Sequence, residues 1–178
     1  MMTPKDVMES EEYQLERQAT ALKKMGDWDG AIAALRQVKA LQDHRYQSTR
    51  LAKYLQQAGR LDDALQEIEW LVEHSQQWAV AMFAHQPASV LQCQRISWLV
   101  RVHGDAILIC KRAKRTDLQT EHERKKMAYV ALLENLKPLA DSERKKVFKD
   151  WKAAHKKGLK AVLAFFAARM KRIKRNQQ

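Results

Sequence analysis

Apolar side chains recur at intervals of three and four residues through the first 75 positions, with short polar breaks between the runs. Two of these breaks contain Gly26 and Gly59. The spacing is typical of amphipathic helices, and glycine takes the left-handed backbone that ends a helix without steric penalty. We therefore predict four helices: one capped by Ser10 and running to Met25, one capped by Asp27 or Asp29, one ending at Gly59, and one capped by Asp62 or Asp63. Their main inward-facing positions are Leu15, Ala19, Leu22, Ala31, Ile32, Leu35, Val38, Leu41, Leu51, Ala52, Tyr54, Leu55, Ala64, Leu65, Ile68, Leu71 and Val72.

The two glycines lie 33 positions apart, and the residues around them correspond. Gly26-Asp27-Trp28-Asp29 is followed by Ala31-Ile32, and Gly59 is followed by Ala64-Leu65. A self-similarity of this period indicates a stacked-repeat architecture. The pair resembles tetratricopeptide repeats, in which a small residue and a glycine surround the turn of a helical hairpin; Ala19 and Ala52 match the small position of the first helix, and Ala31 and Ala64 that of the second.

This resemblance implies stacked antiparallel helical hairpins and a concave protein-binding face lined by the first helix of each hairpin. For any one residue of that face, the alternative is an ordinary solvent-exposed helix position with no binding role. The candidate protein-binding positions are Gln14, Arg17, Gln18, Arg50, Lys53 and Tyr54.

Beyond residue 77 the helical spacing continues without the repeat. Pro87 suits the first turn of a new helix, and Gly104-Asp105 is similar to the earlier breaks, so a third, degenerate hairpin is one of two alternatives here. Pro138 is expected to end the helix that precedes it, and a last helix, capped by Asp141 or Ser142, is predicted over about Ser142–Lys174. Its apolar stripe is Phe148, Trp151, His155, Leu159, Val162, Phe166, Met170 and Ile173. Trp70, Trp78 and Trp98 are interpreted as packing residues rather than base-stacking platforms.

These patterns predict an all-α protein: tetratricopeptide-like hairpins followed by long basic amphipathic helices. The predicted domains are residues 1–77 (repeat pair), 78–137 (helical extension) and 138–178 (basic amphipathic helix and tail). Five glycines and three prolines among 178 residues agree with helix nearly throughout.

Charge divides the chain unevenly. The formal net charge is +12, with a balance of −3 over residues 1–77 and +15 over residues 78–178. Clustered cations neutralise phosphates, whereas no nucleic-acid-binding motif that reads bases accompanies them, so nucleic acid, an acidic protein surface and a merely solvated helix face remain alternatives. The candidate contacts are Lys111, Arg112, Lys114, Arg115, Arg124, Lys125, Lys126, Arg144, Lys145, Lys146, Lys149, Lys152, Lys156, Lys171, Arg172, Lys174 and Arg175.

Catalysis and metal binding have no support in the sequence. The six histidines are scattered, and no phosphate-binding glycine loop or nucleophile motif occurs. Cys93 and Cys110 lie outside any paired ligand spacing and fit a reducing compartment. We therefore expect no cofactor and a cytoplasmic location, since the N-terminus is polar and no apolar run is long enough to span a bilayer. A membrane is a less favoured partner, and in that alternative the basic amphipathic helix would lie on an anionic surface with Phe165 and Phe166 inserted.

The sequence thus predicts a non-enzymatic helical adaptor or regulator. Its repeat-like helices would bind a protein partner, and its basic C-terminal region would contact nucleic acid or an acidic partner surface. The alternative is a sequence-nonspecific nucleic-acid-binding protein in which the repeats are only a scaffold. Self-association through the apolar segment Leu159–Ala168 is a further hypothesis.

Overall fold

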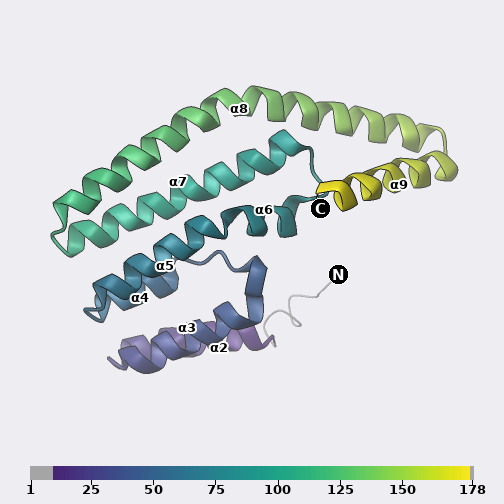
Figure 1. The fold of residues 1–178 in the computed structure, drawn as a ribbon. Coiled ribbons are helices and arrows are strands. Elements are labelled where there is room, and N and C mark those ends of the chain that lie inside the picture. Colours follow the sequence, from purple (N-terminus) through teal and green to yellow (C-terminus); the bar gives the residue numbers. More distant parts are fainter. Residues whose placement is uncertain (1–9, 177–178) are drawn as a thin grey trace. The chain divides into compact units, whose positions relative to one another are not determined.

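The computed structural model describes residues 10–176, and the side chains of residues 10–171. Helices account for 87% of the described residues, which contain no strand (Figure 1). The all-helical prediction is therefore confirmed. The chain divides into two compact units built from alternating segments: unit 1 contains residues up to 74 and residues 102–123, and unit 2 contains residues 75–101 and those from 124 onward.

Unit 1 contains four α-helices in succession. They are α2 (Glu11–Lys24), α3 (Trp28–Gln42), α4 (Arg50–Gln57) and α5 (Leu61–Glu73), with the short 3-10 helix η1 (Asp43–Arg45) between α3 and α4. Each helix packs against the next along the chain. The alternation of helix and short turn follows from the glycine-containing breaks in the sequence.

The helix ends in unit 1 follow local chemistry. The Ser10 hydroxyl accepts a hydrogen bond from the Tyr13 backbone N–H, and the Asp27 carboxylate accepts one from the Gly30 N–H at 2.9 Å. Gly26 and Gly59 have φ of 83° and 79°, where residues with a Cβ are strained. These ends agree with the prediction.

The predicted cap of α5 is wrong. Arg60, not Asp62 or Asp63, holds the N-cap position of α5, and its side chain makes no capping hydrogen bond. The two aspartates lie in the first turn, where the positive end of the helix dipole favours a carboxylate.

The core of unit 1 consists of the predicted inward positions for the most part. Leu41 differs, since it is exposed. From the other segment of unit 1, Val102, Ala106, Ile109 and Cys110 are also fully buried. The buried residues of α2 to α5 are Ala19, Ala31, Ile32, Ala34, Leu35, Val38, Leu51, Ala52, Tyr54, Leu55, Ala64, Glu67, Ile68 and Leu71.

Unit 2 contains α6 (Ser75–Phe83), most of the long helices α7 (Ala88–Arg112) and α8 (Thr116–Lys156), and α9 (Leu159–Asn176). Its packing includes Trp78 against Trp98, with ring centroids 5.7 Å apart, and a cluster formed by Val90 and Cys93 of α7 with Ala140 of α8. Trp78 and Trp98 are buried, as expected of core residues, and Trp70 of unit 1 is half-buried.

Two breaks considered in the sequence analysis are absent from this part of the chain. Gly104 lies inside α7, so the alternative of a third hairpin turn there is not realised. Pro138 lies inside α8 rather than at its end, and Asp141 and Ser142, the predicted caps of the next helix, also lie inside α8. Proline has no backbone N–H, so the Glu134 carbonyl, four residues earlier, loses its helical hydrogen bond. Pro138 and Glu134 are both exposed, so water can bind this carbonyl instead.

The predicted final helix over Ser142–Lys174 is in fact two helices. Lys157 and Gly158 separate α8 from α9, and Gly158 has a φ of 91°. The predicted domain boundaries after residues 77 and 137 fall inside α6 and α8. The three-part division stays a prediction. Over the described residues, no helix combines the length and apolarity needed to cross a membrane.

Candidate functional site

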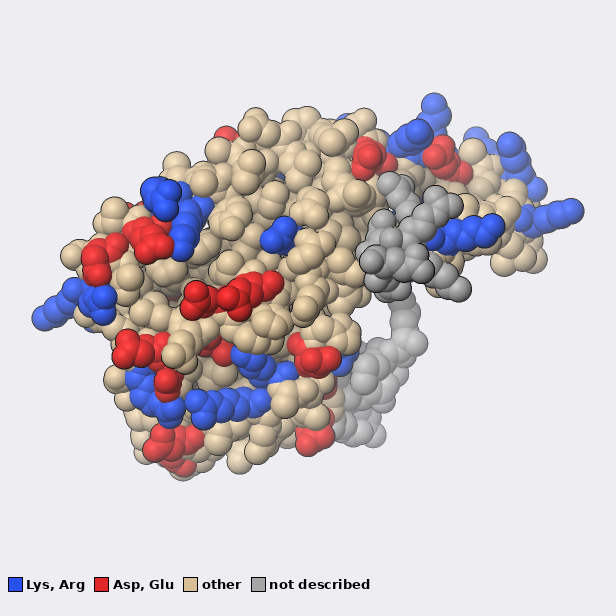
Figure 2. Space-filling view, viewed as in Figure 1, with Lys and Arg blue, Asp and Glu red and all other residues tan. Residues whose placement is uncertain are grey.

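Four lysines form one face of α8 near its C-terminal end. Lys145, Lys149, Lys152 and Lys156 follow intervals of four, three and four residues, and all four are exposed. At 3.6 residues per turn they lie within an arc of about 60° and extend over about 16 Å of helix. We call this set the lysine face. Figure 2 shows lysine and arginine side chains projecting where α8 and α9 meet.

Packing within unit 2 explains why this face is turned to solvent. Leu133, Leu136 and Ala140 contact the buried cluster of α7, and helical geometry places them on the opposite side of α8 from the lysines. Asp150 is the one acidic residue between positions 145 and 156, and it lies about 100° or more from most of the lysine face. The face therefore has positive charge without an acidic residue among its members.

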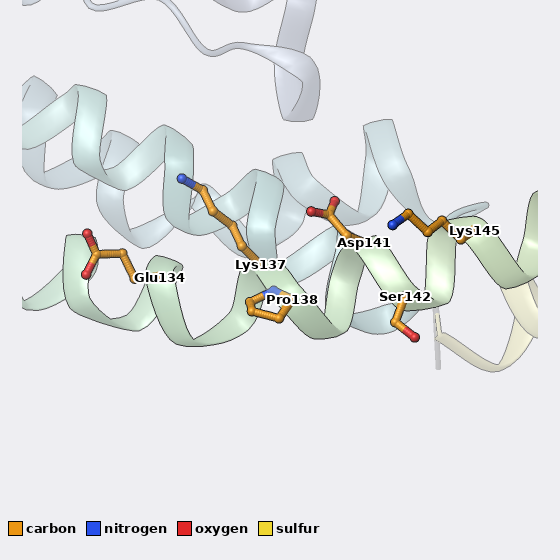
Figure 3. A pocket seen from close by; sticks show the side chains of 6 residues that line it. All are labelled: Glu134, Lys137, Pro138, Asp141, Ser142 and Lys145. Atoms are coloured by element: carbon orange, nitrogen blue, oxygen red, sulfur yellow. The ribbon is translucent and has the colours of Figure 1, made fainter.

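An open hollow of about 620 Å³ borders the lysine face on its N-terminal side. In Figure 3, Glu134, Lys137, Asp141 and Lys145 extend along the same side of α8, while Ser142 points to the other side. Acidic and basic side chains alternate here, so the hollow carries no net charge. It marks where the purely basic surface ends.

The other basic candidates of unit 2 differ in exposure. Arg144 lies 3.7 Å from Asp141, and Lys125 and Lys126 are half-buried. Arg124, Lys146 and Lys171 are exposed, but Lys146 lies off the lysine face by about 100°. The side chains of Arg172, Lys174 and Arg175 lie outside the described residues.

A second basic cluster occupies the turn between α7 and α8, in unit 1. Lys111, Arg112 and Lys114 are exposed there. Arg115 is engaged by Asp117, with its Nε and a terminal nitrogen 3.2 and 3.0 Å from the two carboxylate oxygens. Hydrogen bonding to Arg115 lowers the pKa of Asp117, so both groups remain charged and the Arg115 charge is locally balanced. This cluster therefore offers fewer uncompensated cations than its sequence suggests.

The candidate protein-binding positions separate into two groups. Gln14, Arg17 and Gln18 of α2 are exposed. The three α4 positions are occupied within unit 1: Tyr54 is buried, Lys53 pairs with Asp105 at 2.8 Å, and Arg50 pairs with Glu16 of α2 at 3.1 Å.

A hollow of about 430 Å³ lies along α2, and of the exposed α2 candidates Arg17 lines it. It is lined by Tyr13, Glu16, Arg17, Thr20, Ala21, Lys24 and Arg50. The lining comes from α2 except for Arg50, which α4 contributes.

Two surface features depart from the single continuous apolar stripe that the sequence predicted. Phe148 is 54% exposed instead of packing within a continuous stripe, and Leu159, Leu163, Phe166 and Met170 form an exposed apolar face on α9. Leu163 was absent from the predicted stripe because that stripe assumed one uninterrupted helix. The left-handed backbone at Gly158 changes the register between the two segments.

No group of three or more His, Cys, Asp or Glu side chains in the described part of the chain could hold a metal ion. His103 and His122 do approach each other in unit 1, with their Nδ1 atoms 3.0 Å apart. No protein-family model matches the chain, and comparisons with curated proteins and with solved structures find no match. Function must therefore be argued from the surfaces described above.

Proposed function

We propose that this chain is a non-catalytic helical protein that binds the phosphate backbone of nucleic acid through the lysine face of α8. The observation that carries the proposal is the alignment of Lys145, Lys149, Lys152 and Lys156 on one exposed helix face. Successive lysines are separated along the helix axis by about 4.5 to 6 Å, a range comparable to the spacing of phosphates along a strand. Each contact releases a condensed counterion, which makes such binding tight at low salt.

The same surface supplies no base-specific readout. Lysine is a flexible point charge, whereas sequence discrimination relies on bidentate or shape-dependent contacts in a groove. The proposed binding is therefore tolerant of sequence and sensitive to ionic strength.

For unit 1 we propose the tetratricopeptide-like hairpin arrangement. Four residues support it: Ala19, Ala31, Ala52 and Ala64, at the small positions of the two repeats, are all fully buried. The ion pair between Arg50 and Glu16 also joins the first helices of the two hairpins. A second candidate function, binding of a protein partner, is favoured by the exposed α2 side chains Gln14, Arg17 and Gln18 and by the hollow that Arg17 lines.

Two variants that remove equal charge test the nucleic-acid proposal. The first replaces Lys145, Lys149 and Lys152 with glutamine, and the matched control replaces Lys111, Arg112 and Lys114 with glutamine. Fluorescence anisotropy of a labelled oligonucleotide at low salt is expected to show a loss of affinity of at least about tenfold for the first variant and a much smaller loss for the control.

Three outcomes would count against the proposal. Equal losses in both variants would mean that net charge, not the lysine face, governs binding. Absence of binding by the unmodified protein would reject nucleic acid altogether. Selective binding of polyglutamate in place of the oligonucleotide would assign the lysine face to an acidic protein surface.

A further inference from the structure

Three aromatic rings follow one another along α8 beside the lysine face. The Phe148 and Trp151 rings have centroids 6.0 Å apart and an interplanar angle of 17°, and the Trp151 and His155 centroids are 5.5 Å apart. The rings thus form a continuous aromatic row next to a row of cations.

Phe148 is the most apolar of the exposed side chains in this row. It is 54% exposed, while Trp151 is half-buried. A large apolar side chain in this position gains only about half of the stabilisation that full burial would give, because about half of its surface remains in water. The part of the ring that stays in solvent is open to a ligand.

Cations surround Phe148 on the helix surface. Lys145 precedes it by three residues and Lys152 follows it by four, which places both next to it on α8. The Lys152 Nζ lies 4.5 Å from the Phe148 ring centroid. A ligand that touches the ring would therefore meet ammonium groups on the same face.

A ligand that fits both features has negative charges at regular intervals and flat rings between them. Duplex nucleic acid presents its phosphates but keeps its bases stacked inside the helix. Single-stranded nucleic acid presents both, and aromatic side chains beside a basic track are how proteins bind it without sequence preference.

We infer that α8 is a binding platform for single-stranded nucleic acid, in which the lysine face holds the phosphates and Phe148 stacks against a base. This inference rests on the proposed function and specifies its substrate. It assigns to Phe148 a role in affinity that net charge alone does not provide.

Three labelled probes of equal length test the inference: an oligothymidylate strand, a DNA duplex, and a strand with the same backbone but abasic sites in place of its bases. The proteins compared are the unmodified chain, Phe148→Ala, Phe148→Trp and the control Phe166→Ala. Phe166 is a suitable control because it is also half exposed, at 50%, but lies on α9. Circular dichroism confirms that each variant is folded before affinities are compared.

The unmodified protein is expected to bind oligothymidylate more tightly than the abasic strand. Phe148→Ala is expected to lose about five- to 150-fold in affinity for oligothymidylate, the range associated with one base–aromatic stack, and little for the abasic strand. Phe148→Trp and Phe166→Ala are expected to retain binding.

Different results would overturn base stacking on Phe148 and phosphate binding by the lysine face. Equal binding of oligothymidylate and the abasic strand, or equal effects of Phe148→Ala and Phe166→Ala, would overturn the stacking platform while phosphate binding stands. Preference for the duplex would also overturn it. Absence of binding to all three probes would overturn both the platform and the proposed function.

Discussion

The ion pair between Lys39 and Glu67 joins α3 to α5, and its removal is expected to destabilise unit 1. The Lys39 Nζ lies 2.6 Å from a Glu67 carboxylate oxygen and 3.5 Å from the centroid of the Trp70 ring. The Glu67 side chain is 8% exposed and that of Lys39 is 22% exposed. Among the described residues, the second carboxylate oxygen of Glu67 has no hydrogen-bond partner. Lys39 therefore supplies the main compensation of the Glu67 charge, and Arg36 and His74 add smaller contributions.

The substitution Lys39→Met removes this compensation but keeps most of the apolar stem. Breaking a fully buried pair costs about 3 to 5 kcal/mol, and partial exposure of Lys39 reduces this to about 2 to 3 kcal/mol of unfolding free energy at neutral pH. Loss of the contact with Trp70 is included in that range.

The deficit is expected to depend on pH. Burial raises the pKa of Glu67 above its ordinary value of 4.5, and the hydrogen bond and charge of Lys39 oppose this rise. Because the folded pKa is raised, the contribution of Glu67 to stability is fully present below pH 4.5 and is lost as the pH rises through the folded pKa. Removing Lys39 raises that pKa further, so the deficit of the variant should be greatest at neutral pH and shrink toward pH 4.5.

Urea unfolding followed by circular dichroism at pH 7.5 and pH 4.5 measures both effects. Adding Glu67→Gln to Lys39→Met should recover much of the loss at pH 7.5, since the uncompensated charge is gone. Arg45→Met is the matched control, because Arg45 is exposed and lies 3.9 Å from Glu12; it should cost less than about 0.5 kcal/mol. A loss for Lys39→Met no larger than the control, or one that is the same at both pH values, would refute the reasoning.

Three further predictions concern single positions or faces. Asp27→Ala should lower the unfolding free energy by about 1 kcal/mol, because the helix α3 loses its cap; urea unfolding would show no change if the cap were unimportant. Lys114 has a φ of 56°, so Lys114→Gly should raise the thermal midpoint by relieving roughly 1 kcal/mol of strain, and a lower midpoint would contradict this. If the exposed apolar face of α9 mediates self-association, light scattering should report an oligomer that Leu163→Glu dissociates, and a monomer at high protein concentration would reject the idea.

Local chemistry was enough to predict most helix ends of unit 1, with the N-cap of α5 as the exception. Ser10 and Asp27 cap helices because their side-chain oxygens reach free backbone N–H groups, and Gly26 ends one because it tolerates a left-handed backbone. These preferences belong to the residues themselves. The burial of Ala19 and Ile32 likewise followed from spacing alone.

The sequence did not predict helix interruptions that depend on tertiary context. Pro138 was expected to interrupt a helix, and an interruption at Gly104 was one alternative; neither residue interrupts one, whereas Gly158 does. A proline is tolerated when the carbonyl it leaves unpaired faces water, as the exposure of Pro138 allows. Whether a helix continues through such a residue depends on what lies around it.

In the candidate site, too, some features follow from sequence spacing and others depend on tertiary packing. All four members of the lysine face were among the predicted basic contacts, and their spacing alone would place them on one face. The exposure of Phe148 could not be predicted, because it depends on which side of α8 packs against α7. The ion pair between Arg50 and Glu16 could not be predicted either, because it depends on how α4 lies against α2.

The salt dependence of single-strand binding tests the central claim most directly. For contacts from four lysines to a single strand, a plot of log affinity against log salt concentration should have a slope of about −2.8 or steeper. The variant with Lys145, Lys149 and Lys152 replaced by glutamine should have a slope about 2 smaller in magnitude. A slope near zero for the unmodified protein, or an unchanged slope in the variant, would contradict phosphate binding by the lysine face.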